Sequence, residues 1–320
     1  MKNKNGVMSV NAIIEKITEQ IQEGIYPGAS LALYRKGQWS EHYLGLADPE
    51  KGESVVADLV YDLASVSKVV GVATICAFLY AKGELALDRP FKELYPRFAH
   101  EKTTIRELLT HTSGLDPFIP NRDQLDARQL KTALENLQLK EDKSFHYTDV
   151  NFLLLGFWLE DRFHQPLDRL FEELIFTPWK MTETRFGPVE KAVPTVRGLA
   201  SGSVHDPKAR VLGCHAGSAG LFSTVADLER FLEHYLKDDF ARDLSQNFAR
   251  EEGKTRALGW NLEGDWLDHT GYTGTFIMYN RKRQEAVIFL SNRTYEKDER
   301  AQWILDRNSL MDLIKQECEK

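Results

Sequence analysis

Apolar residues follow two different spacings along the chain, and each spacing predicts a different element. Between residues 9 and 23 they recur every three or four positions, which predicts an amphipathic helix ending near Gly24. Residues 28–34 and 39–47 have the composition of strands, and Lys36-Gly37 between them suits a hairpin turn. The N-terminal part therefore predicts a helix followed by two paired strands.

The middle of the chain has a helical character. A long apolar helix is expected at 67–82, closed by Gly83. Residues 88–200 are rich in proline and contain several short helix patterns. These patterns cover 105–110, 130–137, 149–163 and 167–176. We interpret residues 88–200 as a mostly helical insertion.

Strand patterns return near the C-terminus, at 258–262, 266–270, 273–280 and 285–291, before a closing helix at 299–318. Strands at both ends around a helical middle predict an α/β (α+β) fold. An antiparallel sheet would be flanked by the two terminal helices on one face. The predicted domains are a sheet domain, 1–87 and 201–320, and an inserted helical domain, 88–200.

Composition narrows the class of protein. The chain has 320 residues, 42% of them hydrophobic, and a net charge of −7 with mixed signs, so no basic stripe for nucleic acid is expected. The apolar run at 69–79 is shorter than a bilayer requires, and the polar N-terminus lacks a signal-peptide pattern. Three separated cysteines indicate free thiols, so we expect a cytoplasmic protein that binds no membrane.

Ser65-Val66-Ser67-Lys68 lies where an extended run, residues 60–64, meets the apolar helix pattern. A helix completes a turn in about 3.6 residues, so the Lys68 amine is expected within reach of the Ser65 hydroxyl. A serine becomes an effective nucleophile when a neighbouring base takes its proton. The alternative is a plain helix start, with Ser65 as N-cap and Lys68 as a solvated surface residue.

Tyr147-Thr148-Asp149 stands just before another helix pattern. A tyrosine hydroxyl beside Ser65 and Lys68 could relay protons to a leaving group. The alternative is structural: Tyr147 would be a half-buried aromatic residue and Asp149 an N-cap.

Two glycine-containing segments near the C-terminus are further candidates. His269-Thr270-Gly271-Tyr272 joins two strand patterns, where a strand edge could bind a substrate main chain and a backbone N–H could face an oxyanion. It could equally be a hairpin without a ligand. Residues 217–224 precede a helix starting near Ala226. They could form a flexible turn in which Ser223 or Thr224 caps that helix, or they could form a wall of the pocket.

Together, these segments resemble the serine β-lactamase and penicillin-binding protein superfamily. The likeness is strongest to the class C β-lactamase-like branch, which includes esterases and D-Ala-D-Ala peptidases. It spans residues 10 to 315. The matching segments are Leu63-Ala64-Ser65-Val66-Ser67-Lys68, Leu108-Leu109-Thr110-His111-Thr112-Ser113-Gly114-Leu115, Tyr147-Thr148-Asp149, Ala219-Gly220-Leu221-Phe222-Ser223-Thr224 and His269-Thr270-Gly271.

The resemblance implies roles for the matching residues. Ser65 would be the acylated nucleophile, Lys68 would orient it and relay its proton, and Tyr147 would pass protons to the leaving group and help activate the deacylating water. The N–H groups of Ser65 and Tyr272 would form the oxyanion hole. Substrate would be bound by Asp149, which stands where many members carry Asn, and by the triplet His269, Thr270 and Gly271.

Two departures from the family pattern change the expected chemistry. Asp149 adds a negative charge that should keep Lys68 protonated. Lys68 would then be a weaker starting base, and Tyr147 would be the expected base. His269 replaces the lysine of a Lys-Thr-Gly triplet and is mostly neutral at pH 7, so a fixed positive charge for a substrate carboxylate is lost. Weak β-lactam hydrolysis is therefore expected.

The leading hypothesis is a serine hydrolase, of esterase or D-Ala peptidase type, that works through a covalent acyl-enzyme. Its substrate would be a small ester, amide or D-amino-acid peptide. The alternative is a non-catalytic or slow-turnover penicillin-binding or sensor-type protein that binds acyl or peptidyl ligands. Nine scattered histidines and the absence of paired cysteine spacings predict no metal, and no phosphate-binding loop or other cofactor motif appears.

Overall fold

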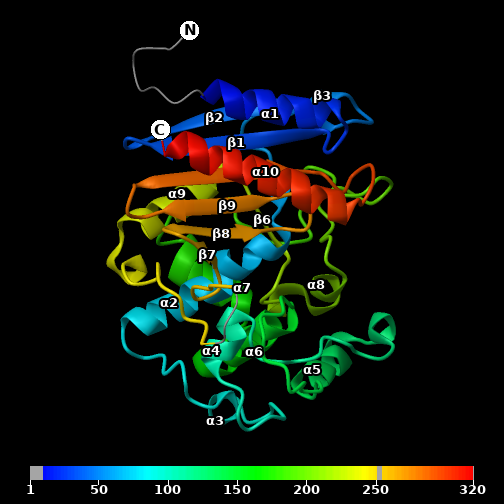
Figure 1. The fold of residues 1–320 in the computed structure, drawn as a ribbon. Helices are drawn as coiled ribbons and strands as arrows, with labels where there is room; N and C mark the ends of the chain where they lie inside the picture. The colour runs from blue at the N-terminus through cyan, green and yellow to red at the C-terminus, as the bar shows by residue number, and fades with distance from the viewer. Residues whose placement is uncertain (1–9, 251–253, 320) are drawn as a thin grey trace.

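A seven-stranded antiparallel sheet forms one half of the protein in the computed structural model, which describes residues 10–250 and 254–319 (Figure 1). The strand order is β3-β2-β1-β10-β9-β8-β7, so the N-terminal β1 pairs directly with the C-terminal β10, with Leu31 opposite Phe289. The strands are β1 (Gly28–Arg35), β2 (Gln38–Asp48), β3 (Glu53–Ser54), β7 (Asn261–Glu263), β8 (Trp266–Thr270), β9 (Phe276–Asn280) and β10 (Glu285–Ser291). The expected fold class is confirmed.

The first hairpin has the turn that its sequence predicts. Lys36 and Gly37 both have positive φ, 49° and 82°, and they join β1 to β2 in register from Arg35 opposite Gln38. Positive φ at both central residues is the geometry whose twist matches that of antiparallel strands. This hairpin pairs one edge of β1 with β2 and leaves the other edge for the central strand, β10.

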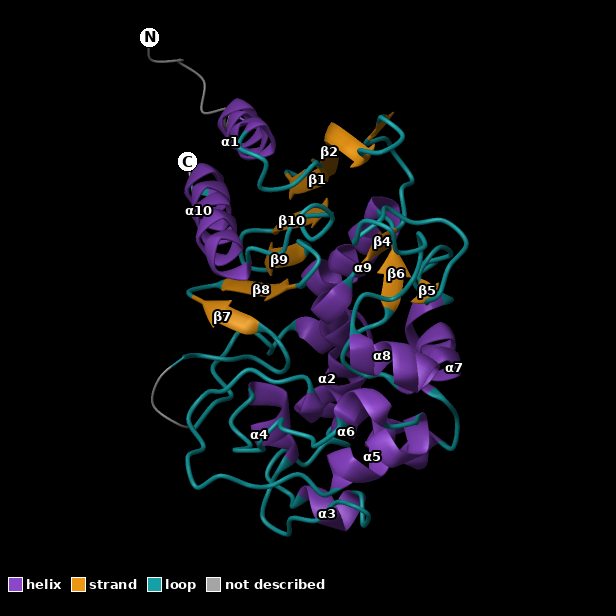
Figure 2. Ribbon diagram, turned by 90° about the vertical axis from the view of Figure 1, so that its right-hand side faces the viewer, coloured by secondary structure: helices purple, strands orange, loops and turns teal. Residues whose placement is uncertain are grey.

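The terminal helices α1 (Val10–Gln22) and α10 (Arg300–Cys318) lie side by side on one face of the sheet, as the sequence predicts (Figures 1 and 2). They bury Ile13, Ile17 and Ile314 in a core shared with Leu31 and Phe289. Helix α9 (Val225–Lys237) covers the opposite face, and its N-terminus is capped by the side chain of Thr224, one of the two expected caps.

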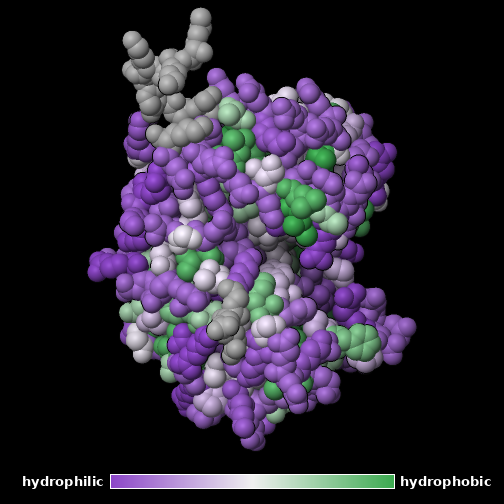
Figure 3. Space-filling view, viewed as in Figure 1, coloured by the Kyte–Doolittle hydropathy of each residue, from purple (hydrophilic) through white to green (hydrophobic). Residues whose placement is uncertain are grey.

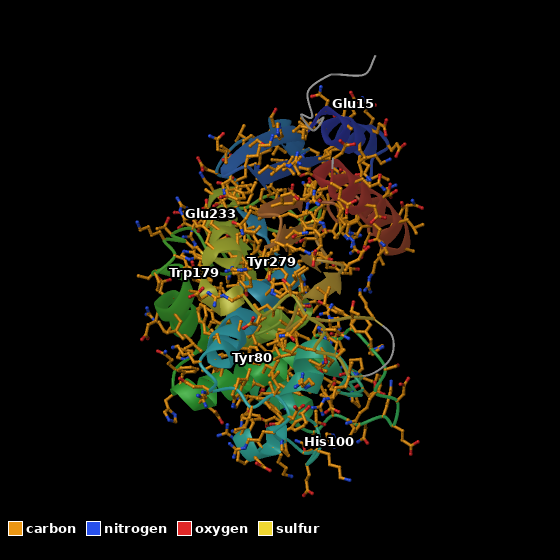
Figure 4. All side chains as sticks on the ribbon, turned by 60° about the vertical axis from the view of Figure 1, so that its left-hand side comes forward. Glu15, Tyr80, His100, Trp179, Glu233 and Tyr279 are labelled. Carbon is orange, nitrogen blue, oxygen red and sulfur yellow. The ribbon has the colours of Figure 1, made fainter. Side chains whose placement is uncertain are left out.

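The other half of the protein is mostly helical. Its elements are α2 (Thr74–Ala81), α3 (Phe91–Leu94), α4 (Ile105–Thr110), α5 (Ala127–Glu135), α6 (Val150–Phe163), α7 (Leu167–Phe171) and α8 (Pro207–Leu212), with a small sheet of β4 (Tyr61–Asp62), β6 (Leu221–Ser223) and β5 (Arg185–Phe186). One hydrophobic core runs from these helices to the sheet, where Tyr279 lies in the interior (Figure 4). The division at residues 88 and 200 stays a prediction.

The helix expected at 67–82 is not a single α-helix. It consists of a 3₁₀ turn, Ala64–Val66, a π-helical segment, Val69–Ala73, and α2. The Thr74 hydroxyl donates a hydrogen bond of 2.6 Å to the carbonyl of Val69, five residues earlier. This bond supports the wider π turn, which apolar spacing alone could not reveal. Similarly, the helix expected at 167–176 is α7 followed by a π segment, Glu172–Phe176.

Two of the expected strands are shorter than the sequence suggests. β7 covers only Asn261–Glu263, and β9 begins at Phe276 rather than at residue 273. In the second case Gly274 has a φ of 102°, and the hydroxyls of Thr273 and Thr275 donate to the carbonyls of Asp62 and Leu63. These residues bind the turn before Ser65 instead of extending the strand.

The sequence led us to expect an apolar run, residues 69–79, too short to span a bilayer, but the helical stretch Ala64–Ala81 is longer. Within the described residues it is the one helical stretch long and apolar enough to cross a membrane, and 78% of it is buried inside the protein. The core helix of a soluble protein passes the same test, so this is weak evidence for a membrane span. That the protein binds no membrane remains a prediction.

Candidate active site

Ser65 lies on a strained turn that several buried contacts hold. Ala64 just before it has a φ of 45°, a conformation that non-glycine residues rarely adopt. The carboxylate of Asp62 accepts hydrogen bonds from the N–H groups of Ala64, at 2.8 Å, and His205, at 2.7 Å. Burial raises the pKa of Asp62 to about 6, although both backbone donors act in the opposite direction. Asp62 therefore joins the turn of Ser65 to the loop at His205.

The side chain of Lys68 is directed at Ser65, not at solvent. It is completely buried, and its Nζ donates to Ser65 Oγ at 2.9 Å, to Asp149 Oδ1 at 3.0 Å and to the Ser218 carbonyl at 2.9 Å. The alternative that Lys68 is a solvated surface residue is wrong. The predicted contact between the Lys68 amine and the Ser65 hydroxyl is present.

The charges around Lys68 favour its ammonium form. Burial alone would lower the pKa of Lys68, but the carboxylate of Asp149 and the phenol of Tyr147, which also hydrogen-bonds Lys68, outweigh it. The pKa therefore lies above its ordinary value, in the direction expected from the charge of Asp149. In its resting form Lys68 is a donor to Ser65 and not a base.

Asp149 stands at the N-cap position of α6 but does not cap it. Its side chain makes no capping hydrogen bond, and its φ and ψ, −66° and −30°, are helical. Its two oxygens instead contact Lys68 and Lys208, the latter at 3.1 Å. Burial would raise the pKa of Asp149, but the two ammonium groups outweigh it and hold it well below its ordinary value. The N-cap interpretation is wrong because the carboxylate pairs with two ammonium groups, the buried Lys68 and the partly buried Lys208, instead of with the N–H groups of the helix.

Tyr147 lies over the ammonium of Lys68, whose Nζ is 5.2 Å from the centre of the tyrosine ring. The ring also packs against that of His111, with 4.6 Å between centroids and 39° between the ring planes. His111 ends α4 in the left-handed conformation, φ 58°, and its carbonyl accepts from the N–H of His146 at 2.9 Å. The segment 108–115, which carries part of the family resemblance, thus supports the loop that presents Tyr147.

His269 is placed behind Tyr147, with 6.1 Å between ring centroids and 2% of its surface exposed. Its Nδ1 lies 3.1 Å from the carbonyl of Thr270, which can only accept, so Nδ1 carries the proton. Burial, then the charges of Lys68 and Arg256, lower the pKa of His269 well below its ordinary value. The ring is neutral at pH 7, as expected, and supplies no fixed positive charge.

Two adjoining cavities share Ser65, Tyr147 and Tyr272 in their walls, with volumes of about 590 and 220 Å³. The larger also borders Asp149 and Lys208, and the smaller borders the triplet from His269 to Gly271. Figure 3 shows the face seen in Figure 1 as largely hydrophilic and hollowed between α10 and the helical half. The predicted site residues therefore line these two adjoining cavities, except Lys68, which is buried directly behind Ser65.

The backbone at Tyr272, the expected second half of the oxyanion hole, is tightly held. Its carbonyl accepts from Arg293 Nε at 2.9 Å, and its hydroxyl donates to Asp298. A Cβ at Gly271 would lie 2.6 Å from the carbonyl of Leu63, so only glycine allows the loop to approach the turn of Ser65 this closely. The oxyanion hole itself stays a prediction.

Lys208 and Asp62 are the site residues that sequence reasoning missed. A buried carboxylate with two oxygens requires more than one donor, so Asp149 could have suggested a second cation. Lys208 lies in the long segment between β5 and β6, where the sequence shows no motif. Among the described residues, no group of three or more His, Cys, Asp or Glu side chains is placed to hold a metal ion.

This fold and this arrangement of serine, lysine and tyrosine define a serine hydrolase of the β-lactamase and peptidase class. The chain belongs to the β-lactamase family, whose model, described as "Beta-lactamase", matches residues 13–310.

Individual relatives agree with this assignment. The chain is 27% identical to the "Putative D-alanyl-D-alanine carboxypeptidase" of Escherichia coli K12, over 90% of this chain and 83% of that protein. Its fold resembles that of a β-lactamase/D-alanine carboxypeptidase from Pseudomonas syringae, with a TM-score of 0.73, 20% identity and coverage of 93% and 98%. It also resembles EstCE1, described as a hydrolase with promiscuous acyltransferase activity, with a TM-score of 0.73, 19% identity and coverage of 94% and 97%.

Proposed function

We propose that this protein hydrolyses small peptides ending in a D-amino acid, or related amides and esters, through a covalent acyl-enzyme on Ser65. The observation that carries the proposal is the 2.9 Å hydrogen bond between the buried Lys68 ammonium and Ser65 Oγ, with the ring of Tyr147 over the ammonium and in the wall of the same cavity as Ser65. A structural lysine would have no reason to direct its charge at an accessible serine hydroxyl in the wall of a cavity.

In the proposed reaction, the active form has lost one proton from the pair Lys68 and Tyr147. The Ser65 hydroxyl attacks the substrate carbonyl and gives its proton to this pair, while the oxyanion accepts hydrogen bonds from the N–H groups of Ser65 and Tyr272. The pair then protonates the leaving group as the bond to it breaks. A water molecule reverses the sequence on the acyl-serine and releases the acid.

The charge of the smaller cavity supports a substrate that carries a carboxylate. Its described lining includes Lys254, Arg300 and Arg307 and no Asp or Glu. Burial and neighbouring positive charges lower the pKa values of Lys254 and Arg307, which is the situation of cations held close together. These three side chains would replace the charge that His269 lacks. The name of the E. coli relative, a D-alanyl-D-alanine carboxypeptidase, points to the same kind of substrate.

A location in the cytoplasm is part of the proposal. Cys76 and Cys318 are buried and Cys214 is half-buried, and all three are free thiols. Free thiols are typical of a reducing compartment and support this location.

Labelling with a fluorophosphonate and peptide mapping test the nucleophile. We expect the label on Ser65 of the wild type and none on Ser65→Ala; an unlabelled wild-type Ser65 would contradict the proposal. Turnover then separates the alternatives, with a peptide ending in D-Ala-D-Ala, p-nitrophenyl acetate and nitrocefin as substrates. A stable acyl-enzyme that never releases product would favour the sensor-type alternative.

The carboxylate is tested with the same peptide as free acid and as C-terminal amide. Arg307→Gln should raise KM for the acid about tenfold, equivalent to about 1.4 kcal/mol, and leave the amide unchanged. Lys282→Gln, at an exposed residue paired with Asp265, is the matched control. Equal effects on acid and amide would exclude a role of Arg307 in carboxylate binding.

A further inference from the structure

Lys208 is the second ammonium group at the candidate site, and it comes from a part of the chain with no motif. It follows Pro207 at the start of α8, whose N-terminus is capped by the Asp206 carboxylate accepting from the N–H of Ala209 at 2.8 Å. This cap fixes the backbone of Lys208. Its side chain is 14% exposed, borders the 590 Å³ cavity and reaches Asp149 Oδ2 at 3.1 Å.

The contacts form a line of four groups. Ser65 Oγ contacts Lys68 Nζ at 2.9 Å, Lys68 contacts Asp149 Oδ1 at 3.0 Å, and Asp149 Oδ2 contacts Lys208 at 3.1 Å. Each oxygen of the single carboxylate thus has its own ammonium. A carboxylate that serves only to neutralise Lys68 would need no second cation, and a surface lysine would not be this well buried.

We propose that Lys208 is a positioning residue for acylation of Ser65: it holds the Asp149 carboxylate in place and takes up half of its charge, so that Lys68 can release a proton. This inference rests on the proposed function. It adds a residue outside the matched motifs and states what that residue does for the reaction.

The electrostatic argument depends on which groups face Lys68. They are Asp149 and Tyr147 from the start of α6 and the loop before it, the Ser218 carbonyl before β6, and the neutral rings of His111 after α4 and His269 on β8. Asp149 is the one carboxylate in this set. Without Lys208 its whole charge would act on Lys68, and the ammonium form would be held more tightly.

Other charged groups line the cavity beside Lys208: Asp206 and Arg210 from α8 and the loop before it, and Arg122, Asp298 and Arg300 from other segments. Asp206 is engaged as the helix cap, and Arg210 donates to the carbonyl of His205 at 2.9 Å. Among the described residues, Asp149 forms ion pairs with Lys68 and Lys208, and none of these other charged side chains is paired with it. Loss of the Lys208 charge therefore leaves Asp149 Oδ2 without a cation in direct contact.

The test measures kcat/KM against pH for Lys208→Met and Lys208→Arg, with p-nitrophenyl acetate as a neutral substrate. We expect Lys208→Met to lower kcat/KM at pH 7 about tenfold and to move the acid limb of the profile upward by about one pH unit. Lys208→Arg keeps the charge and should leave the limb in place. Lys282→Met, which removes an exposed lysine paired with Asp265, should change nothing.

A double-mutant cycle with Asp149→Asn separates positioning from general damage. If Lys208 acts through Asp149, Lys208→Met should have little further effect on kcat/KM in the Asp149→Asn background. An acid limb that does not move in Lys208→Met, or an equal tenfold loss in both backgrounds, would overturn the inference.

A readout without turnover keeps the inference testable if the proposed function fails. The melting temperature should fall by about 2–4 °C in Lys208→Met and by much less when Asp149→Asn is already present. Additive losses would mean that Lys208 does not position Asp149. Fluorophosphonate labelling of wild-type Ser65 reports separately on the proposed function.

Discussion

The ring of Tyr147 packs at a tilt of 39° against the buried ring of His111, with 4.6 Å between their centroids. This contact ties the phenol to the left-handed turn that ends α4, so Tyr147 keeps its position above Lys68 although 37% of its surface is exposed. A substitution that removes only the Tyr147 hydroxyl should therefore leave the position of the ring unchanged.

Tyr147→Phe should keep the ring contact and lose the proton relay. We expect kcat to fall between about 10²- and 10⁴-fold, the range typical of a positioned acid–base group, with an unchanged melting temperature. Steady-state kinetics and thermal unfolding measure the two quantities. Tyr80→Phe changes a partly buried tyrosine that packs on Phe248, and it should alter neither; a kcat within twofold of wild type in Tyr147→Phe would exclude the relay.

The buried histidines predict how stability depends on pH. Burial, then the charges of Arg256 and Lys68, lower the pKa of His111 well below its ordinary value. Below pH 6.5 the unfolded chain binds protons that the folded ring does not, so the free energy of unfolding falls as the pH drops. His111→Asn should make this fall less steep, because asparagine tolerates the left-handed turn and does not titrate.

The control for that experiment is His164→Asn. His164 has the same left-handed conformation, φ 55°, but is exposed at the end of α6. Urea unfolding at pH 5 and pH 7 gives the slope for each variant. The same slope in His111→Asn and wild type would show that His111 titrates similarly in the folded and unfolded chain.

Asp62→Asn should damage the turn that presents Ser65. An amide offers one acceptor where the carboxylate accepts from the N–H groups of both Ala64 and His205, so about 1–3 kcal/mol of stability should be lost at pH 7.5. The raised pKa of Asp62, about 6, means that wild-type stability from this group declines as the pH rises from 4 to 6.

Because asparagine does not titrate, the loss of stability in Asp62→Asn relative to wild type should be larger at pH 5 than at pH 7.5. Denaturant unfolding at both values measures it, with Asp161→Asn, an exposed residue paired with Arg97, as control. Labelling of Ser65 should slow in parallel. Unchanged labelling would mean that the bonds of Asp62 do not hold the nucleophile.

Gly71→Ala tests the packing of the π segment beside Lys68. A Cβ at this position would lie 2.4 Å from the ring of Phe171, whereas helix propensity alone would favour alanine by less than about 1 kcal/mol. We expect a net loss of about 1–3 kcal/mol from overpacking. Adding Phe171→Leu should recover part of that loss. If it does not, the clash with Phe171 is not the cause of the lost stability.

Sequence reasoning predicted the strands, the terminal helices and the contact between Ser65 and Lys68 from local spacing, and it predicted the packing of the two terminal helices from the order of the elements. It also anticipated the charged state of Lys68 from Asp149 alone. It could not find Lys208, since a single lysine distant in the chain leaves no periodic signal. The π turn at 69–73 was missed for a related reason: its hydrogen bond from Thr74 involves one side chain in an otherwise uniform apolar run.

The pairing of β1 with β10 has a consequence for biosynthesis. β1 is the first of the seven strands to be synthesised, and its second edge stays unpaired until residues 285–291 of β10 have been made. During translation the nascent polypeptide thus exposes an unpaired apolar edge, and contacts this distant in sequence form slowly. A message truncated before these codons would yield a polypeptide with an open sheet, which the quality-control machinery of a cell should recognise and degrade.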